Sequence, residues 1–373
     1  MTSPDPLEHA PRARTPIRLA IIGAGWAGRR QAEAVQELDG RFEVVCFVDP
    51  DVEHAAGVAR ELGIATATDD LPGVLSDGTI DAVSICTPHR LHASMTVAAA
   101  RHGKHVLVEK PMATTVAEGL EMLAAARSHG VRLVVAENQV YEAATQRLRE
   151  VVSAPEALGN VAFASIVDGY RARDPRYAGR RDWLTDPAAG GTGTWMLQGI
   201  HTVARIRAIF GEISSVYVRE HRTPTFRRDD LEATMSALLV TASGFSIWLV
   251  QTPEVALPAR FMIQVFGDES TLIGDATGFE TIEADGRRSD RHVFEPGPRS
   301  SYALELAAFA AEIHEAEIAP TTASSEIRSL AVVEAGHESA RTNRPVEIRT
   351  RYPDLESESD KLDITATIKE MLP

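Results

Sequence analysis

The chain has 373 residues, of which 44% are hydrophobic and 24% are charged, a balance typical of globular proteins. Its net charge of −15 argues against nucleic acid and anionic membranes as partners, and no apolar run approaches the roughly 20 residues needed to span a bilayer. A chain of this length is expected to fold as two domains.

Residues 1–16 are rich in proline and charge and lack an apolar core. We therefore expect a disordered tail there and no secretory signal. The two cysteines, Cys46 and Cys86, both fall in predicted buried strands. This favours reduced core thiols in a cytoplasmic protein over a disulfide.

Residues 17–139 alternate between apolar runs and helical patterns. The runs predicted to be strands are Ile17–Ile22, Phe42–Val48, Ala82–Cys86, His105–Val108 and Arg132–Ala136, with helical patterns between them, for example at His92–Arg101 and Val116–His129. Alternation of this kind predicts an α/β domain with a parallel sheet and helices on both faces.

The pattern changes over residues 140–350. A helix at Tyr141–Val152 precedes predicted strands at Val161–Asp168, Ser214–His221, Ala233–Leu239, Phe245–Gln251, Arg260–Phe266 and Thr271–Ile273, and helices at Tyr302–Glu317 and Ser324–Thr342 follow. The spacing predicts a second domain with an antiparallel or mixed sheet. Residues 278–300 are expected to form a hairpin with loops, and residues 351–373 are an acidic, weakly patterned segment.

A glycine turn joins the first strand to a predicted helix at Ala27–Leu38. Its residues are Gly23, Ala24, Gly25, Trp26, Ala27 and Gly28. The first glycine permits the tight turn, the second lets the backbone approach a pyrophosphate, and the third lets helix and strand pack closely. The helix directs its free N–H groups at the phosphates. An incidental turn is the alternative, but the flanking strand and helix favour a dinucleotide site.

Asp49 ends the second strand, about 20 residues beyond Gly28, where an acidic residue usually binds the ribose 2′-hydroxyl. A carboxylate there repels a 2′-phosphate, which favours NAD over NADP. Arg29, Arg30 or Arg60 could still receive a phosphate.

Lys110 follows the strand His105–Val108, between Glu109 and Pro111. An ammonium group at the carboxyl end of a parallel strand points into the crevice where ligands bind. There it can hydrogen-bond a reacting hydroxyl and stabilise developing alkoxide charge. A surface lysine is the alternative. Asn138 and Gln139 end the last strand of this domain and should also face the nicotinamide.

Several segments, in the right order, resemble the glucose–fructose oxidoreductase / inositol dehydrogenase / rhizopine catabolism (Gfo/Idh/MocA) family. They are IRLAIIGAGWAG at 17–28, VDPD at 48–51, CTPHRLHASM at 86–95, GKHVLVEKPMATT at 103–115, AGGTGTWMLQGIH at 189–201 and ESARTNRPVEI at 338–348. The resemblance implies a Rossmann domain, then an α+β domain with a large open, mostly antiparallel sheet. It also implies a nicotinamide cofactor, chemistry on a ring hydroxyl of a sugar, cyclitol or related compound, and pairing into homodimers or homotetramers through the outer face of that sheet.

The resemblance also implies roles for single residues. Glu109 would contact the cofactor ribose, and the bond before Pro111 would be cis. Thr87, Pro88 and His92 would line the cofactor site. His201, on a predicted helix at Trp195–Phe210, matches the family's catalytic histidine, and histidine suits a general base near pH 7.

The chain departs from the family pattern near His201. Many relatives carry aspartates four residues before and three residues after this histidine, where the chain has Leu197 and Ala204. Gln198 lies three residues before His201, on the same helical face. Its amide can position a substrate or the imidazole but cannot take a proton. We therefore expect a site of Lys110 and His201, with Gln198 as an orienting residue.

An arginine-rich segment precedes this helix, with arginines at positions 171, 173, 176, 180 and 181. It is either an ordinary solvated loop or a clamp for an anionic substrate such as a uronate or a sugar phosphate, because guanidinium groups suit carboxylate and phosphate. The candidate substrate ligands are Tyr170, Arg171, Arg173, Trp183 and Gln198.

Two histidine pairs, His89 with His92 and His102 with His105, have spacings seen in metal sites. No third ligand converges on either pair in the sequence, so we expect no metal.

The sequence thus predicts an NAD-dependent oxidoreductase that transfers hydride between nicotinamide and a ring hydroxyl or ketone of a small molecule. Two alternatives remain open. One is an enzyme that recycles bound NAD internally during epimerisation or elimination. The other is a non-catalytic, nucleotide-sensing regulator on the same fold.

Overall fold

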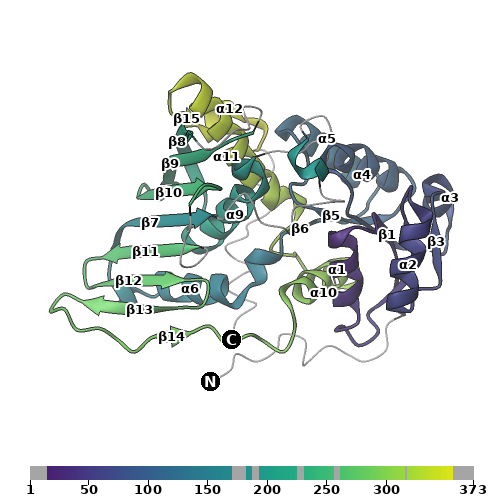
Figure 1. Ribbon diagram of the computed structural model, residues 1–373, viewed down its shortest axis with the longest axis horizontal. Coiled ribbons are helices and arrows are strands. Elements are labelled where there is room, and N and C mark those ends of the chain that lie inside the picture. Colours follow the sequence, from purple (N-terminus) through teal and green to yellow (C-terminus); the bar gives the residue numbers. More distant parts are fainter. Residues whose placement is uncertain are drawn as a thin grey trace.

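The computed structural model describes residues 15–169, 182–186, 193–224, 231–255, 261–315 and 317–355. Two sheets lie on either side of a group of buried helices (Figure 1). Helix α11 (Ala323–Thr342) contacts β8 of one sheet and helix α5 (Val116–Ser128), which covers the other. Within the described residues, no helix is both long and apolar enough to cross a membrane.

The first sheet has six parallel strands in the order β3-β2-β1-β4-β5-β6. They are β1 (Ile17–Ile22), β2 (Phe42–Val48), β3 (Thr66–Thr68), β4 (Ala82–Ile85), β5 (His105–Glu109) and β6 (Leu133–Ala136). The five predicted strands are confirmed. The sequence did not indicate β3, because a three-residue edge strand of threonine and alanine has no apolar pattern.

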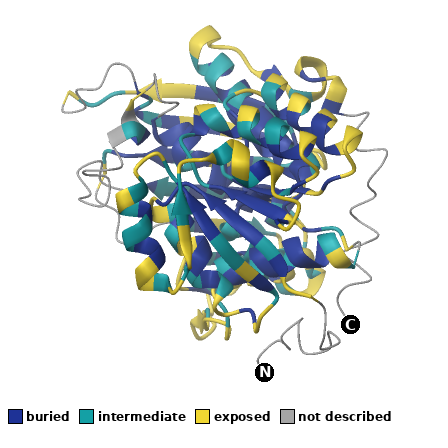
Figure 2. Cartoon of the chain, turned by 90° about the vertical axis from the view of Figure 1, so that its right-hand side faces the viewer, coloured by how far each residue is buried: buried dark blue, intermediate teal, exposed yellow. Residues whose placement is uncertain are grey.

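Helices cover both faces of this sheet, as predicted. They are α1 (Trp26–Val35), α2 (Val52–Leu62), α3 (Leu71–Ser76), α4 (His92–Arg101) and α5. Figure 2 shows the buried strands running between helices that expose their outer faces. The fold of this half is therefore the Rossmann arrangement that the sequence predicts.

The second sheet has nine strands in the order β14-β13-β12-β11-β7-β10-β9-β8-β15. They are β7 (Val161–Gly169), β8 (Ile213–His221), β9 (Thr234–Thr241), β10 (Ser246–Thr252), β11 (Met262–Gly267), β12 (Ser270–Asp275), β13 (Gly278–Glu283), β14 (His292–Val293) and β15 (Val346–Glu347). All neighbours are antiparallel except β7 and β10. The expected large, mostly antiparallel sheet is confirmed.

The remaining helices follow the first sheet in the chain. They are α6 (Ala143–Ser153), α7 (Pro155–Leu158), α8 (Thr194–Leu197), α9 (Gly199–Phe210), α10 (Ser301–His314) and α12 (Ile348–Arg351), with short 3₁₀ turns η1 (His89–Leu91), η2 (Asn138–Tyr141) and η4 (Asp182–Thr185). Helix α10 packs on α1 and η2 of the Rossmann half.

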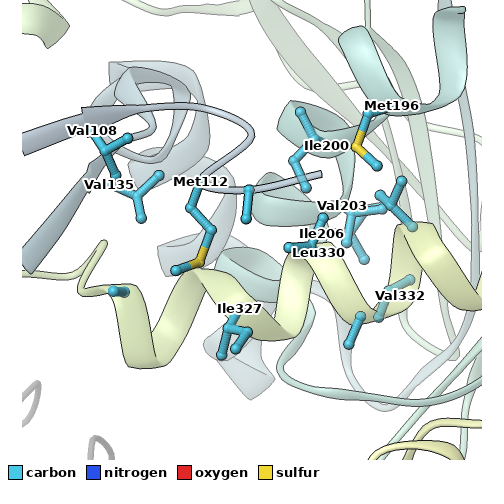
Figure 3. Close-up of a cluster of buried hydrophobic side chains, with 14 of the residues drawn as sticks. Val108, Met112, Val135, Met196, Ile200, Val203, Ile206, Ile327, Leu330 and Val332 are labelled. Atoms are coloured by element: carbon cyan, nitrogen blue, oxygen red, sulfur yellow. The ribbon is translucent and has the colours of Figure 1, made fainter. Parts of the chain in front are cut away.

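Helix α9 is buried along nearly its whole length. Its apolar side chains Ile200, Val203 and Ile206 pack toward Ile327 and Leu330 of α11 (Figure 3). The polar side chains of α9 are therefore available to the elements on its other sides.

The single helix predicted over Trp195–Phe210 is interrupted at Gln198, between α8 and α9. Gln198 has φ −112° and ψ −37°, off the helical average. The carbonyl of Leu197, at the end of α8, accepts a hydrogen bond from Lys110, a long-range contact that helical periodicity does not report.

The terminal segments lie largely outside the described residues, namely 1–14 and 356–373. Part of the predicted acidic C-terminal segment does pack on the fold, since Tyr352 and Leu355 are buried.

Candidate active site

Two of the three glycines in the turn after β1 are required by the fold itself. Gly23 has φ +103°, and a Cβ there would lie 2.5 Å from the carbonyl oxygen of Cys86. A Cβ on Gly28 would lie 1.9 Å from the Gly23 carbonyl oxygen. A Cβ on Gly25, by contrast, would meet no atom of the described residues within 4 Å beyond its chain neighbours. Within the described residues, Gly25 therefore borders open space at the N-terminus of α1.

Trp26 and Ala27 begin α1. The Trp26 side chain is about half exposed, at 49%. It lies edge-on to Tyr302 of α10, with ring centroids 6.2 Å apart, and beside Arg30. An exposed indole at this turn offers an apolar surface next to the phosphate cradle.

Asp49, at the end of β2, reaches the same turn. Its Oδ2 accepts a hydrogen bond from Ala24 N at 2.9 Å, and its Oδ1 accepts one from Asp51 N at 2.9 Å. The carboxylate is thus fixed beside the turn, where a ribose would lie. Arg29 and Arg30, which the sequence offered as phosphate ligands, both form ion pairs with Glu33.

The loop after β4 is tied to the turn after β5 by His92. This imidazole is fully buried; its Nδ1 lies 2.8 Å from the Pro111 carbonyl oxygen and its Nε2 2.9 Å from that of Thr87. Burial lowers the pKa of His92. Pro88 starts η1 in this loop, and the Trp183 ring lies edge-on to His89 at 5.0 Å.

His102, a member of the second histidine pair, also contacts the backbone: its Nδ1 lies 2.9 Å from the Ala98 carbonyl oxygen. Among the described residues, no group of three or more histidine, cysteine or acidic side chains could hold a metal ion.

Glu109 is the last residue of β5 and Lys110 follows it, and the bond from Lys110 to Pro111 is cis. Lys110 Nζ donates a hydrogen bond to the Leu197 carbonyl oxygen at 2.8 Å, which joins the Rossmann half to α8. Desolvation raises the pKa of Glu109 to about 7, against the opposing effect of Lys110. Gln31 Nε2 lies 3.5 Å from a Glu109 carboxylate oxygen.

His201, in the first turn of α9, contacts Glu137. The ring Nδ1 lies 2.6 Å from Oε1 and 2.8 Å from Oε2 of Glu137, which is fully buried at the end of β6. Burial raises the pKa of Glu137 to about 7, although Lys110 and Arg205 act in the opposite direction. The sequence analysis missed Glu137. Its position directly after an apolar strand, before Asn138, was the available signal.

Asn138 and Gln139 also form hydrogen bonds with helices of the second half. Asn138 Nδ2 donates a hydrogen bond to Ser301 Oγ of α10 at 2.9 Å, and the Gln139 carbonyl oxygen accepts one from Thr145. These contacts hold η2, and with it Glu137, between the two halves.

The polar side of α9 continues beyond His201. Thr202 Oγ1 donates a hydrogen bond to Asp168 Oδ2 of β7 at 2.6 Å and lies 2.9 Å from Gln251 Oε1 of β10. The guanidinium of Arg205 lies over the Phe261 ring at 3.5 Å. Gln198 lies at the junction of α8 and α9. The parallel strands β7 and β10 thus end in polar residues that face α9.

The predicted substrate ligands Tyr170, Arg171 and Arg173 lie outside the described residues, with the rest of the arginine cluster. Trp183 is described, and its ring packs on the loop after β4.

Comparison with known proteins agrees with this fold. The model of the GFO_IDH_MocA oxidoreductase family with an NAD-binding Rossmann fold matches residues 17–137, and that of the family's C-terminal alpha/beta domain matches residues 156–348. The chain belongs to the Gfo/Idh/MocA oxidoreductase family. It is accordingly an NAD(P)-dependent oxidoreductase that acts on CH–OH groups.

Curated relatives match along most of their length. The chain is 30% identical to D-xylose 1-dehydrogenase (NADP(+)) 2 of Haloferax volcanii, covering 89% of this chain and 100% of the relative. It is 28% identical to D-apiose dehydrogenase of Paraburkholderia graminis, covering 93% of each.

Solved structures share the fold. An oxidoreductase from Agrobacterium radiobacter in complex with NAD+, L-tartaric acid and magnesium superposes with a TM-score of 0.79 at 20% identity, over 90% of this chain and 100% of that one. Levoglucosan dehydrogenase in complex with NADH also gives 0.79 at 20% identity, over 89% and 99%.

Proposed function

We propose that this oxidoreductase is an NAD-preferring dehydrogenase of a sugar, cyclitol or related ring alcohol, with Lys110 and His201 at the reacting hydroxyl. The observation that carries the proposal is the convergence of these two residues. Lys110 Nζ bonds to the carbonyl of Leu197, and His201 follows one helical turn later. Both residues therefore approach the junction of α8 and α9, and both act on Glu137: His201 Nδ1 lies 2.6 Å from its carboxylate, and the charge of Lys110 lowers its pKa.

The cofactor would be held by residues already described. The N-terminus of α1 beside Gly25 suits the pyrophosphate, Asp49 the adenine-side ribose, and Glu109 the second ribose. When bound, the nicotinamide accepts hydride from the substrate carbon or returns it. His201 takes the hydroxyl proton in the oxidative direction, while Lys110 donates a hydrogen bond to the same oxygen and stabilises its developing negative charge. In the reductive direction His201 returns the proton.

The preference for NAD rests on charge. The Asp49 carboxylate stands where a 2′-phosphate would lie, and Arg29 and Arg30 are already engaged by Glu33. One relative carries NADP(+) in its name, so both cofactors belong in the assay.

The substrate class rests on the relatives, which are named for xylose, apiose and other sugars. The test is formation of reduced nicotinamide with a panel of neutral and anionic ring alcohols, with NAD and NADP in parallel. Turnover of neutral sugars or cyclitols supports the proposal as stated. Turnover of the anionic class alone assigns the arginine-rich segment to substrate capture. If no compound of the panel yields reduced nicotinamide while NAD still binds, the proposal is contradicted.

We also propose that the protein is a cytoplasmic homo-oligomer that pairs through the outer face of the nine-stranded sheet. Trp248 on β10 is 62% exposed, and Phe163 on β7 is 38% exposed and stacks on Phe266 at 4.3 Å. Leu238 on β9 extends the same face. Exposed apolar patches on a sheet favour a protein partner. Cys46 and Cys86 are both free thiols, as in a reducing compartment.

A further inference from the structure

Neither position 197 nor position 204, close to His201 in the chain, holds an acidic residue; Leu197 and Ala204 stand there. The structure nevertheless brings a carboxylate to His201 from a different element. Glu137 lies at the end of β6 in the Rossmann half, 64 residues from His201 in the chain. Both of its oxygens are within 2.8 Å of His201 Nδ1.

This contact is buried. Glu137 is fully buried, and His201 is only 8% exposed. The Glu137 side chain also caps η2, because its Oε1 accepts a hydrogen bond from Gln139 N at 3.2 Å. A carboxylate anchored to backbone on one side offers a fixed acceptor to the imidazole on the other.

The charges around the pair favour the same arrangement. Lys110 and Arg205 both act to keep Glu137 ionised, against a burial effect that raises its pKa to about 7. A buried carboxylate next to an imidazole stabilises the imidazolium that proton uptake creates. The two groups are close enough to titrate as one unit.

We propose that Glu137 is the positioning carboxylate of His201. Its carboxylate accepts a hydrogen bond from Nδ1–H, fixes the tautomer and orientation of the ring, and leaves Nε2 as the basic atom. In the oxidative direction the substrate O–H bond breaks and an Nε2–H bond forms, and the Glu137 carboxylate balances the new imidazolium charge. This inference rests on the proposed role of His201 as the proton acceptor.

A purely structural reading is the competitor, in which the pair only fastens β6 to α9. The two readings differ for Glu137→Gln. An amide keeps a hydrogen-bonding group of the same shape, so a fastening role predicts a small effect. A positioning role predicts that kcat falls by about 100-fold, because a wrongly held base loses most of its contribution.

The matched control is Glu312→Gln. Glu312 on α10 is also buried, accepts a hydrogen bond from Ala319 N, and has its pKa raised to about 7 by burial. It lies outside the cofactor and proton-transfer residues described above. We expect kcat of Glu312→Gln within about twofold of the wild type. We expect the dissociation constant for NAD to stay within about twofold for both variants, which separates this effect from loss of the cofactor site.

Two further measurements keep the test decisive. The acid limb of the kcat–pH profile should move to lower pH in Glu137→Gln, since an imidazole without a carboxylate is a weaker base; a fastening role leaves the profile in place. Nitrogen-15 NMR of His201 in the wild-type protein should show the proton on Nδ1 at neutral pH, and this readout needs neither turnover nor a folded variant.

A wild-type ring protonated on Nε2 with a bare Nδ1 overturns the proposal, as does a Glu137→Gln enzyme with kcat and pH profile unchanged. If the wild type oxidises no ring alcohol, the proposed function fails, while the NMR result still decides whether Glu137 sets the tautomer.

Discussion

Lys110 donates a hydrogen bond to the main-chain carbonyl of Leu197, the last residue of α8. A backbone carbonyl is a neutral acceptor, so this contact orients the ammonium group without neutralising it. The contact survives replacement of the residue 197 side chain. It also joins the segment after β5 to the end of α8, across the two halves.

Lys110→Ala should reduce kcat by about 100-fold or more, because both the hydrogen bond to the reacting oxygen and the stabilising charge are lost. NAD should still bind, since Lys110 is not part of the phosphate cradle. Steady-state kinetics and NAD titration check the two statements. Lys110→Arg keeps the charge but changes its shape and should recover only part of the activity. Near-normal turnover of Lys110→Ala would remove it from the mechanism.

Gly25→Ala and Gly28→Ala should separate binding from folding. Gly25 has φ −74°, which alanine adopts freely, and an added methyl group meets no protein atom. We expect unchanged thermal stability and NAD binding weakened at least about tenfold, or about 1.4 kcal/mol. Gly28→Ala forces its Cβ against the Gly23 carbonyl and should lower the free energy of unfolding by about 3 kcal/mol. Normal NAD binding by Gly25→Ala would place the phosphates elsewhere.

Asp49→Ser combined with Pro50→Arg should shift the preference toward NADP. The double change removes the carboxylate beside the turn and adds a guanidinium that suits a 2′-phosphate. Affinities for both cofactors, measured by titration, give the ratio, and Pro50→Arg alone is the control for added charge. An unchanged ratio in the double variant contradicts the assignment of Asp49 to the ribose.

Glu305→Gln should change how stability depends on pH. Glu305 on α10 is fully buried against Gln31, and its pKa lies well above the ordinary value because of burial and the nearby Glu109. A carboxyl whose pKa is raised in the folded state stabilises the fold fully below its unfolded pKa of about 4.3, and this contribution is lost as the pH rises through the folded pKa.

The glutamine of the variant does not titrate. The melting temperature of the variant minus that of the wild type should therefore increase as the pH rises from about 5 to about 9. Glu53→Gln, at an exposed position on α2, is the control and should show no such trend. If the difference in melting temperature between Glu305→Gln and the wild type is constant across this pH range, Glu305 is not protonated in the folded protein.

Trp248→Glu should lower the mass of the particle in solution. A charge in the middle of the apolar patch on β10 opposes burial against a second copy. Light scattering should find a dimer or larger for the wild type and a smaller species for the variant. Val293→Glu, on the edge strand β14 and 53% exposed, provides the matched control. A monomeric wild type would exclude pairing through this face.

The sequence predicted the parts of the site that follow directly from strand ends. Gly23 to Gly28, Asp49 and Lys110 each come after an apolar run, and the carboxyl ends of parallel strands meet at one edge, so their proximity follows from the local pattern. The break at Gln198 and the Glu137–His201 contact do not follow from it. The break adjoins a contact between Lys110, after β5, and Leu197 of α8, and the second contact joins the end of β6 to α9; each links elements of different halves.

The packing of α10 against α1 makes the two halves interdependent. Phe309 of α10 stacks on Phe42 of β2, with ring centroids 6.3 Å apart, and both belong to one buried cluster with β1. Residues from the last fifth of the chain therefore complete the core on which the dinucleotide turn rests. A ribosome must have synthesised α10 before the first strands gain their full covering, so the nucleotide-binding half completes its folding only late in translation.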